Sequence, residues 1–510
     1  MGKNIARLYS AELEGIDANI IEVEADVNVG LHSFNIVGLA DRSLNEAKER
    51  VNSALKNSGV KPPNRENRKI TINLAPADVK KTGSHYDLAI ALGYLLATSQ
   101  MKKIDTADKI FLGELALDGR LRPVNGALNI AQRAAAEGFS FLFLPRENAN
   151  EAAAIKGITI VALETLRETL DILSGACVPK PIAHQAEENS AETSQDFAEI
   201  RGQENAKRAL VIAAAAHHNV LLVGPPGVGK SFLAQAMRGI LPPLDAEEAI
   251  EVTKIWSAAG LSPRGLMRER PFRAPHQTSS IGALIGGGQN PRPGEISLAH
   301  RGILFLDELP EFQRNAIEAL RQPLESGIIR VARAKKSLVL PARFTLVAAM
   351  NPCPCGYYGD KEKECKCSAF DVVKYKKKIS GPLLDRIDLQ IRVGRINTED
   401  LRSDPDPKKV NSSIRKIVER TRAIQQERYS NVEAMLLKTN AAASSQEIQK
   451  VARFEKKAES FLGTLGKANL SPRGYYRLIK VARTIADIEE KECVTEEHLA
   501  EAFGYRLKEI

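Results

Sequence analysis

The stretch VLLVGPPGVGKS, Val220 to Ser231, determines the fold of the middle of the chain. Its four leading apolar residues predict a short buried strand, and residues 232–240 predict a helix after the loop. The octet that ends in Ser231 fits G-x-x-x-x-G-K-[ST], a loop whose backbone N–H groups surround a phosphate at the start of a helix. We therefore expect this segment to bind a nucleoside triphosphate, ATP or GTP.

The predicted phosphate site comprises the whole octet, namely Gly224, Pro225, Pro226, Gly227, Val228, Gly229, Lys230 and Ser231. Lys230 is expected to reach the β- and γ-phosphates, and the Ser231 hydroxyl is expected to bind Mg²⁺. The alternative is a chance glycine-rich turn, which the strand–loop–helix context disfavours.

A second apolar strand, residues 303–306, ends in two acidic residues, Asp307 and Glu308. Such a pair is common by itself, but downstream of a phosphate loop it predicts hydrolysis. Asp307 is expected to hold Mg²⁺ together with Ser231, and Glu308 to orient and polarise the attacking water.

A third apolar strand, residues 345–349, is followed by Asn351. An amide at this strand end, beside the other two, is expected to position the same water. The alternative is an asparagine that forms a turn before Pro352.

The composition is that of a soluble, multidomain protein. The 510 residues are enough for about three domains, and 43% of them are hydrophobic. A net charge of +9 suits a polyanionic partner, although charge alone decides little. The first residues lack an apolar signal core, and the most apolar stretch, residues 209–223, is too short to span a bilayer. We expect a cytoplasmic protein that does not bind membranes.

Four of the six cysteines are close together, as Cys353, Cys355, Cys365 and Cys367. Two C-x-C pairs on one loop can supply the four thiolates of a structural Zn²⁺ site. The alternative is four reduced thiols, since disulfides are disfavoured in a reducing cytosol. Cys177 and Cys493 are isolated and are expected to be ordinary reduced thiols.

A polar, acidic stretch at residues 179–199 is typical of a flexible linker. It separates an N-terminal domain, residues 1–178, from an ATPase core at residues 200–395 that contains the cysteine loop 353–367. Strands alternate with helices in the core, which predicts an α/β fold with a parallel sheet. Residues 396–510 have long helical periodicity, for example at 412–427, 444–462, 472–490 and 495–505, and predict a helical lid.

Further motifs carry a family resemblance. Gly202 and Gln203, followed by AKRAL at 206–210, look like the adenine-pocket segment of AAA+ ATPases. The segments 273–302 and 320–333 are similar to the magnesium-chelatase branch, with its insertion before the second nucleotide strand and its β-hairpin before the third. From end to end, the chain resembles the YifB/ComM family of magnesium-chelatase-like ATPases.

The resemblance implies roles for two arginines. Arg386, in SGPLLDRID at 380–388, would be an arginine finger that reaches the γ-phosphate of a neighbouring subunit. Arg473, in LSPR at 470–473, would be a second sensor that contacts nucleotide phosphates. Both assignments imply a ring, expected to be a hexamer. Without the resemblance, an exposed Arg386 paired with Asp385 or Asp388 would be preferred.

The N-terminal domain resembles the Lon-type (S5-type) protease fold, an α+β domain, but departs from it at the catalytic positions. Tyr86 stands where the protease has its nucleophilic serine, and Leu128 where it has its lysine. Ser84 is nearby, but no aligned lysine would activate it. We expect no peptidase activity, and a domain that binds a partner or supports the ring.

Two basic segments are candidates for contact with a nucleic acid. Arg333, Lys335 and Lys336 belong to the predicted hairpin, and residues 374–378 are four lysines around Tyr375, which suits backbone contact and stacking. Solvated basic faces are the alternative for both. The resemblance implies a hexameric ATP-driven motor on DNA, a helicase or branch-migration factor in recombination or natural transformation. The alternative is a chelatase-type or chaperone-like ATPase that remodels a protein partner.

Overall fold

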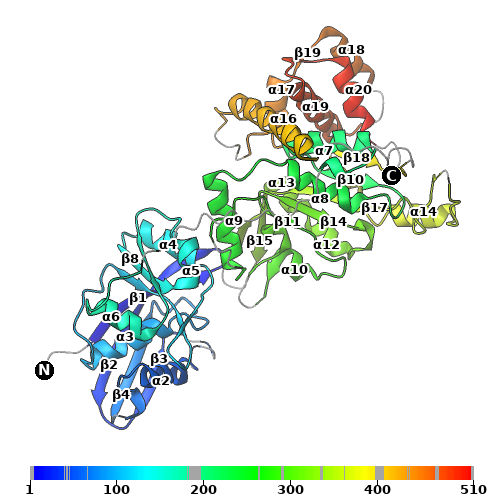
Figure 1. Cartoon of the computed structure of the whole chain (residues 1–510). Coiled ribbons are helices and arrows are strands. Elements are labelled where there is room, and N and C mark those ends of the chain that lie inside the picture. Colours follow the sequence, from blue (N-terminus) through cyan, green and yellow to red (C-terminus); the bar gives the residue numbers. More distant parts are fainter. Residues whose placement is uncertain are drawn as a thin grey trace. The chain divides into compact units, whose positions relative to one another are not determined.

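The computed structural model describes residues 5–39, 41, 44, 46–65, 67–180, 182, 197–261, 265–288, 292–332, 337–360, 362–396, 407–432, 435, 437–465 and 470–506. These residues form two compact units (Figure 1). The first comprises Met1–Glu188, Asp245–Met267 and Gly288–Pro293, and the second comprises Asn189–Leu244, Arg268–Gly287 and Gly294–Ile510.

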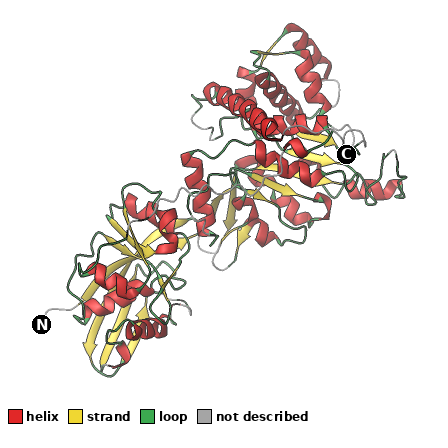
Figure 2. Ribbon diagram, viewed as in Figure 1, coloured by secondary structure: helices red, strands yellow, loops and turns green. Residues whose placement is uncertain are grey.

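The first unit is built on a mixed seven-stranded sheet, counted over its described residues, in the order β3-β4-β2-β1-β5-β8-β9. The strands are β1 (Ile5–Glu14), β2 (Asp17–Val29), β3 (Ser33–Val37), β4 (Arg68–Ala75), β5 (Lys109–Phe111), β8 (Phe141–Pro145) and β9 (Thr159–Leu163), with a small separate pair of β6 (Glu114–Leu115) and β7 (Leu121–Arg122). β2 is antiparallel to β1 and β4, whereas β5, β8 and β9 run parallel to β1. Figure 2 shows this twisted sheet with helices packed on it.

The helices of the first unit are α2 (Ala47–Asn57), α3 (Asp87–Ala97), α4 (Ala127–Ala136), α5 (Arg146–Ala152), α6 (Leu166–Leu173) and α9 (Ala246–Ala258), with a 3-10 turn at Pro63–Arg65 and a short strand β13 (Arg292–Pro293). Helix α3 is apolar along nearly its whole length and is buried accordingly. Helix α9 lies within the segment 200–395 assigned from sequence to the ATPase core, yet it packs on α4. The Gly126 N–H donates to the Ser257 carbonyl at 3.1 Å, and Asn129 Nδ2 donates to the Lys254 carbonyl at 3.2 Å.

The second unit is built on a sheet that is parallel throughout its described strands, in the order β11-β14-β17-β10-β18. These are β10 (Val220–Val223), β11 (Phe272–Arg273), β14 (Ile303–Leu306), β17 (Thr345–Met350) and β18 (Leu389–Arg392). All residues of β10, β14 and β17 are buried, as expected for a sheet covered on both faces. The parallel α/β core expected from the sequence is confirmed.

The remaining elements of this unit fall into two groups. Around the sheet are α7 (Glu204–Ala216), α8 (Lys230–Ile240), α10 (Ile281–Ile285), α11 (Glu295–Leu298), α12 (Arg314–Ala319), α13 (Arg321–Ser326), α14 (Ala369–Lys376) and α15 (Gly381–Leu384), the 3-10 turns η2 (Phe197–Glu199) and η3 (Leu309–Glu311), the short strand β12 (Gly286–Gly287), and an antiparallel hairpin of β15 (Ile328–Ala332) and β16 (Ser337–Pro341). The C-terminal group is α16 (Pro407–Arg428), α17 (Ser445–Val451), α18 (Lys456–Leu465), α19 (Pro472–Ile488) and α20 (Glu496–Gly504), with a two-stranded pair of β19 (Arg453–Phe454) and β20 (Cys493–Val494).

The C-terminal helices share one hydrophobic core with the helices of the sheet. Val418 of α16 and Leu478 of α19 belong to the same buried cluster as Leu222 of β10 and Val347 of β17. Figure 1 shows α16, in orange, lying beside α7. This part of the chain is therefore helical, as expected, but it packs in the same compact unit as the sheet.

A buried charge network links the C-terminal helices. Asp487 is fully buried and bonds Arg428 at 2.5 and 2.6 Å, Arg483 at 3.0 Å and Asn440 at 2.8 Å. Two arginines on one carboxylate leave a positive charge in excess. The rest of the network supplies neutral acceptors, such as the Glu492 carbonyl, which Arg483 bonds at 2.5 Å.

Replacing Asp487 with Asn should destabilise this unit strongly. The change leaves the buried guanidinium group of Arg483 and the partly buried one of Arg428 without their carboxylate, and breaking a buried pair typically costs about 3–5 kcal/mol. The measurement is denaturant unfolding followed by circular dichroism, with Glu419→Gln on the exposed side of α16 as the matched loss of one acid. A loss no larger than that of the control would show that the network contributes little.

Candidate nucleotide-binding site

The phosphate loop joins β10 to α8, as the sequence predicts. Gly227 and Gly229 have φ of +80° and +87°, which glycine adopts at low cost. A side chain at Gly224 would collide with the carbonyl of Val393, so the loop begins with its backbone pressed against the end of β18. The helix begins at Lys230, two residues earlier than the sequence suggested.

Lys230 lies at the centre of this loop. Its Nζ donates to the carbonyls of Gly224 and Pro225, both at 2.8 Å, and to Oδ1 of Asn351 at 3.0 Å. Burial lowers the pKa of Lys230, and the nearby carboxylates of Asp307 and Glu308 oppose that shift. A phosphate that enters the loop offers this ammonium group an anionic acceptor in place of neutral ones.

The acidic motif lies against the loop because β14, β17 and β10 are parallel neighbours whose carboxyl ends share one sheet edge. Asp307 Oδ2 accepts a 2.7 Å hydrogen bond from the Ser231 hydroxyl, and Asp307 Oδ1 accepts one from the Glu308 N–H at 2.9 Å. Glu308 has φ of +50°, a left-handed conformation. A hydroxyl and a carboxylate in contact are oxygen ligands of the kind Mg²⁺ takes, so these residues fit the predicted metal.

The segment assigned to the adenine pocket lies beside the same loop. Gly202 and Gln203 have φ of +58° and +59° and lead into α7. Gln203 Nε2 donates to the carbonyl of Gly394 at 2.5 Å. Because Gly394 follows Val393, against which Gly224 packs, the segment is within reach of a nucleotide in the loop.

The four clustered cysteines converge. Their Sγ atoms lie within 4.8 Å of one another, and Cys353, Cys355 and Cys365 are separated by 3.4–3.7 Å. A tetrahedron with Zn–S bonds of about 2.3 Å has S–S edges of about 3.8 Å, so the set fits zinc. Hydrogen bonding from the Tyr357 backbone is the main cause that lowers the pKa of the Cys355 thiol to about 6, which favours the thiolate there. At Cys365 and Cys367 a backbone hydrogen bond lowers the pKa, but burial and the neighbouring cysteines outweigh it and raise the pKa of both thiols.

The cysteine loop also touches the phosphate loop. Gly356 has φ of +86°, and a Cβ added there would stand 2.7 Å from Cδ of Pro226 and 3.9 Å from Cγ of Asn351. A side chain at Gly356 would therefore collide with Pro226 and come into ordinary contact with Asn351. The cysteine cluster is in position to brace them.

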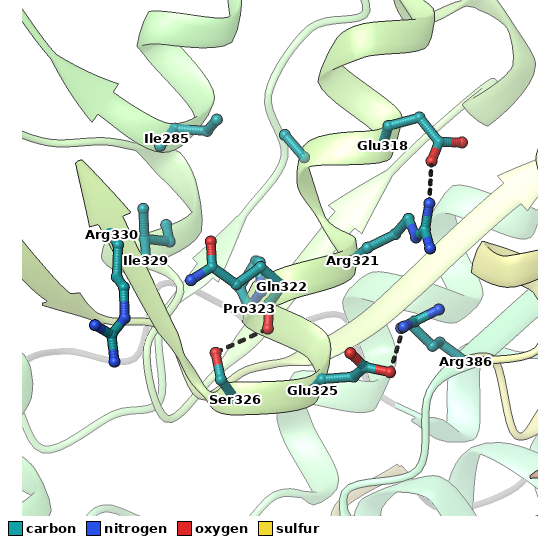
Figure 3. Close-up of a pocket in the computed structure, with 11 residues that line it drawn as sticks. Ile285, Glu318, Arg321, Gln322, Pro323, Glu325, Ser326, Ile329, Arg330 and Arg386 are labelled. Carbon is teal, nitrogen blue, oxygen red and sulfur yellow. Dashed lines mark hydrogen bonds and ion pairs between the residues drawn. The ribbon is translucent and has the colours of Figure 1, made fainter. Parts of the chain in front are cut away.

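The two arginines assigned by resemblance meet on one carboxylate. Arg386 is 3% exposed, donates to the carbonyl of Pro382 at 2.5 Å and forms an ion pair with Glu325, as Figure 3 shows. Arg473 pairs with the same Glu325 oxygen at 3.0 Å. Burial lowers the pKa of Arg386, and its Nε has no partner among the described residues. The alternative of an exposed Arg386 paired with a neighbouring aspartate is wrong.

Arg386 lines an open cavity of about 500 Å³. Its wall in Figure 3 includes Glu325, the Glu318–Arg321 ion pair at 3.1 Å and Arg330. The lining carries three guanidinium groups and two carboxylates, so its net charge is positive even with the Arg321–Glu318 and Arg386–Glu325 pairs formed.

Asn219 is a residue that sequence reasoning missed. It lies directly before β10 and joins it to both neighbouring strands. Its Nδ2 donates to the carbonyl of Arg386 at 3.0 Å, its Oδ1 accepts from the Leu346 N–H at 2.9 Å, and its own N–H donates to Asp388 at 2.9 Å. The sequence offered one signal, a polar residue set against an apolar strand. The phosphate-loop strand and the arginine segment are thus tied together through one side chain.

In the first unit, the two positions that the resemblance aligns with protease catalytic residues, Tyr86 and Leu128, are buried. Tyr86 donates from its hydroxyl to Glu12 at 2.5 Å, and burial raises its pKa well above the usual range. Leu128 lies inside α4, and Ser84 is hydrogen bonded to Glu114.

The β-hairpin expected from the resemblance is present as β15 and β16. The three basic residues assigned to it, Arg333, Lys335 and Lys336, lie outside the described residues. In the part of the chain that the structure describes, no helix combines the length and the apolar character needed to cross a membrane.

This parallel sheet, with its phosphate loop and acidic strand end, defines a P-loop protein of the AAA+ class, and comparison with known families refines the class. The profile described as subunit ChlI of Mg-chelatase matches residues 23–148. That described as magnesium chelatase, subunit ChlI, matches residues 196–401, and that of the ChlI C-terminal part matches residues 409–506.

Individual relatives cover the chain from end to end. It is 41% identical to competence protein ComM of Haemophilus influenzae over 99% of this chain and 97% of that protein. It is 40% identical to the uncharacterized protein YifB of Escherichia coli, over 96% and 95%. A magnesium-chelatase 38 kDa subunit of Rhodobacter capsulatus is 26% identical over 61% of this chain and 87% of its own length. The chain belongs to the YifB/ComM family of magnesium-chelatase-like AAA+ proteins.

Proposed function

We propose that this protein is an ATP-hydrolysing ring, hexameric, that moves along DNA as a helicase or branch-migration factor in recombination or natural transformation. The observation that carries the ATPase part is the cluster of Lys230, Ser231, Asp307 and Asn351, joined by hydrogen bonds of 2.7–3.0 Å. The DNA part rests on the family, in which one relative is named a competence protein. A chelatase-type or chaperone-like ATPase that remodels a protein partner is the second candidate, which the 38 kDa subunit supports.

Within the site, each side chain has one task. Lys230 would exchange its carbonyl acceptors for the β- and γ-phosphates, and Ser231 and Asp307 would hold Mg²⁺, which would supply positive charge beside the phosphates. Glu308 orients the attacking water and accepts its proton. Asn351 already contacts Lys230, so its amide is in position to sense the γ-phosphate.

In a ring, Arg386 acts on the ATP of the neighbouring subunit. Glu325 holds Arg386 and Arg473 side by side, and a phosphate can replace this carboxylate because it offers more anionic oxygens to a guanidinium pair. Arg473 then serves as the second sensor at the same phosphates. Asn219 couples the subunit's own phosphate loop to the arginine that completes its neighbour's site, since it binds the backbone of Arg386 next to the phosphate-loop strand.

We further propose that the first unit has the Lon-protease-like fold and that residues 396–510 form the helical lid. The domain boundaries we propose are residues 1–178, a linker at 179–199, the core at 200–395 and the lid. The burial of Tyr86 and the pairing of Ser84 with Glu114 support a role for the N-terminal domain in binding or ring support.

The first test separates binding from hydrolysis. Lys230→Ala should abolish nucleotide binding or turnover, whereas Glu308→Gln should keep ATP affinity and lower kcat by about 10²–10⁴-fold, the usual contribution of a general base. Steady-state ATPase rates, with and without single-stranded and branched DNA at two salt concentrations, provide the measurement. Normal hydrolysis by Glu308→Gln would assign the water to another group. A strong basal rate that DNA leaves unchanged would favour the protein-remodelling candidate.

The trans role of Arg386 is tested by mixing subunits. Arg386→Ala should be inactive alone, by about 10³–10⁵-fold as for other arginine fingers, yet should bind ATP normally. Mixed with Lys230→Ala, it supplies intact loops while the other subunit supplies intact arginines, so activity should partly return. Co-purification of differently tagged subunits verifies that mixed rings form. Mixed rings that stay inactive would contradict the assignment.

Zinc at the cysteine cluster is tested by elemental analysis. The purified protein should contain about one zinc per chain, and Cys353→Ser with Cys365→Ser should remove it, because a tetrathiolate site needs all four ligands. Cys177→Ser with Cys493→Ser is the control that removes two thiols outside the cluster. Less than about half an equivalent in the wild-type protein would contradict zinc binding.

A further inference from the structure

Helix α14 has two apolar faces. One of them packs against the rest of the unit, and the other is exposed to solvent. Val372, Tyr375 and Ile379 are buried and attach the helix to the rest of the unit. The opposite side carries Phe370, 74% exposed, and Val373, 48% exposed. These outward residues contribute nothing to the core that the buried face already forms, and an exposed phenylalanine is a common mark of a binding surface.

The same outward side carries positive charge. Phe370, Val373, Lys374 and Lys377 are spaced i, i+3, i+4 and i+7, so they share one face of the helix. Asp371, the acidic residue of this helix, forms a capping box with Ser368 at the helix start. Sequence reasoning assigned stacking to Tyr375, and this is wrong, since Tyr375 is 5% exposed and Phe370 is the aromatic ring that solvent reaches.

This face forms one wall of a groove of about 570 Å³, and the segment after the acidic motif forms the other. The groove is lined by Pro310, Glu311, Phe312, Arg314, Phe370, Val373, Lys374, Lys377 and Lys378. Among these described residues Glu311 is the one carboxylate, and it pairs with Lys378 at 3.1 Å. Three further cations, Arg314, Lys374 and Lys377, line the same groove as the exposed Phe370 ring.

We propose that this groove binds a single-stranded nucleic acid, with phosphates on Lys374, Lys377 and Arg314 and a base stacked on Phe370. Cations beside an accessible aromatic ring suit a chain that alternates phosphates with planar bases. A duplex keeps its bases stacked internally and would leave Phe370 without a partner. A purely apolar peptide would leave the three cations without theirs. This proposal rests on the proposed function, and it identifies the surface on which the proposed motor binds a single nucleic-acid strand.

The groove is coupled to the nucleotide site at both walls. Pro310 lies two residues after Glu308, so the strand would bind against the segment that carries the water-orienting carboxylate. On the other wall, the inward-facing Tyr375 lies near the backbone of Asn351, which opposes the rise in the pKa of Tyr375 that burial causes. A nucleic-acid strand bound against α14 would therefore contact the segments that position Glu308 and Asn351. This arrangement links nucleic-acid binding to ATP hydrolysis.

The test is a fluorescence-anisotropy titration of labelled oligo-dT with the full-length protein over a series of salt concentrations. Lys374→Ala with Lys377→Ala should weaken binding and reduce the slope of log K against log salt by about 1.4, since each single-strand phosphate contact contributes about 0.7. The control is Lys450→Ala with Lys457→Ala, which removes the same charge from exposed positions on α17 and α18 and should leave the slope unchanged.

Phe370 gives an independent readout. Phe370→Ala should weaken oligo-dT binding by about 5- to 150-fold, the range for one lost stacked base, with the salt slope unchanged. Phe370→Leu should be as weak, because leucine keeps the apolar surface but cannot stack. Both changes are at an exposed position, so unfolding midpoints and the ATPase rate without DNA should match the wild type.

The outcomes separate this inference from the proposed function. Wild-type protein that binds oligo-dT, with α14 variants indistinguishable from it, would overturn the groove alone. A wild-type protein that binds no nucleic acid would overturn the DNA function and the groove with it. If Phe370→Leu restores binding, or the variants change the oligomeric state by light scattering while oligo-dT affinity is kept, the groove is a protein contact and the inference is wrong.

Discussion

The parallel register of β10 between β17 and β18 is the constraint on which the candidate site depends. Val223, the last residue of β10, pairs with Met350 and with Arg392. The Gly224 N–H then donates to the Met350 carbonyl at 3.2 Å, so Asn351 emerges beside the start of the phosphate loop. A register shift of one residue would turn each side chain of β10 to the opposite face and move Lys230 relative to Asn351, its acceptor on the neighbouring strand end.

Buried polar groups connect this sheet to the C-terminal helices. Asp388 bonds Arg477 of α19 at 2.7 Å and the N–H of Asn219 at 2.9 Å, and this environment holds its pKa well below the usual range against the cost of burial. On the same helix, Thr484 bonds His218 at 2.9 Å. Because a buried charge or amide is costly without its partner, these bonds fix one arrangement of α19 on the sheet.

The chain around Asn351 shows how one sheet edge gathers several functions. The cysteine loop begins two residues later, and its Gly356 packs against Pro226, while Tyr375 of α14 lies near the backbone of Asn351. The proposed metal, nucleotide and nucleic-acid contacts thus share one short backbone segment. A displacement of this backbone segment by a ligand at one of these sites would therefore shift the residues of the other two.

The sequence by itself determined the phosphate loop, the strand ends at Asp307 and Asn351 and the cysteine cluster, because each is a contiguous pattern whose geometry follows from local rules. It also predicted the parallel sheet and the C-terminal helices from hydrophobic periodicity. The tertiary structure alone decided that Arg386 and Arg473 meet on Glu325, and that α9 packs with the first unit. The outward side of α14 was likewise undetermined, since a helix can be rotated about its axis until packing selects the face that is buried, here Tyr375 and not Phe370.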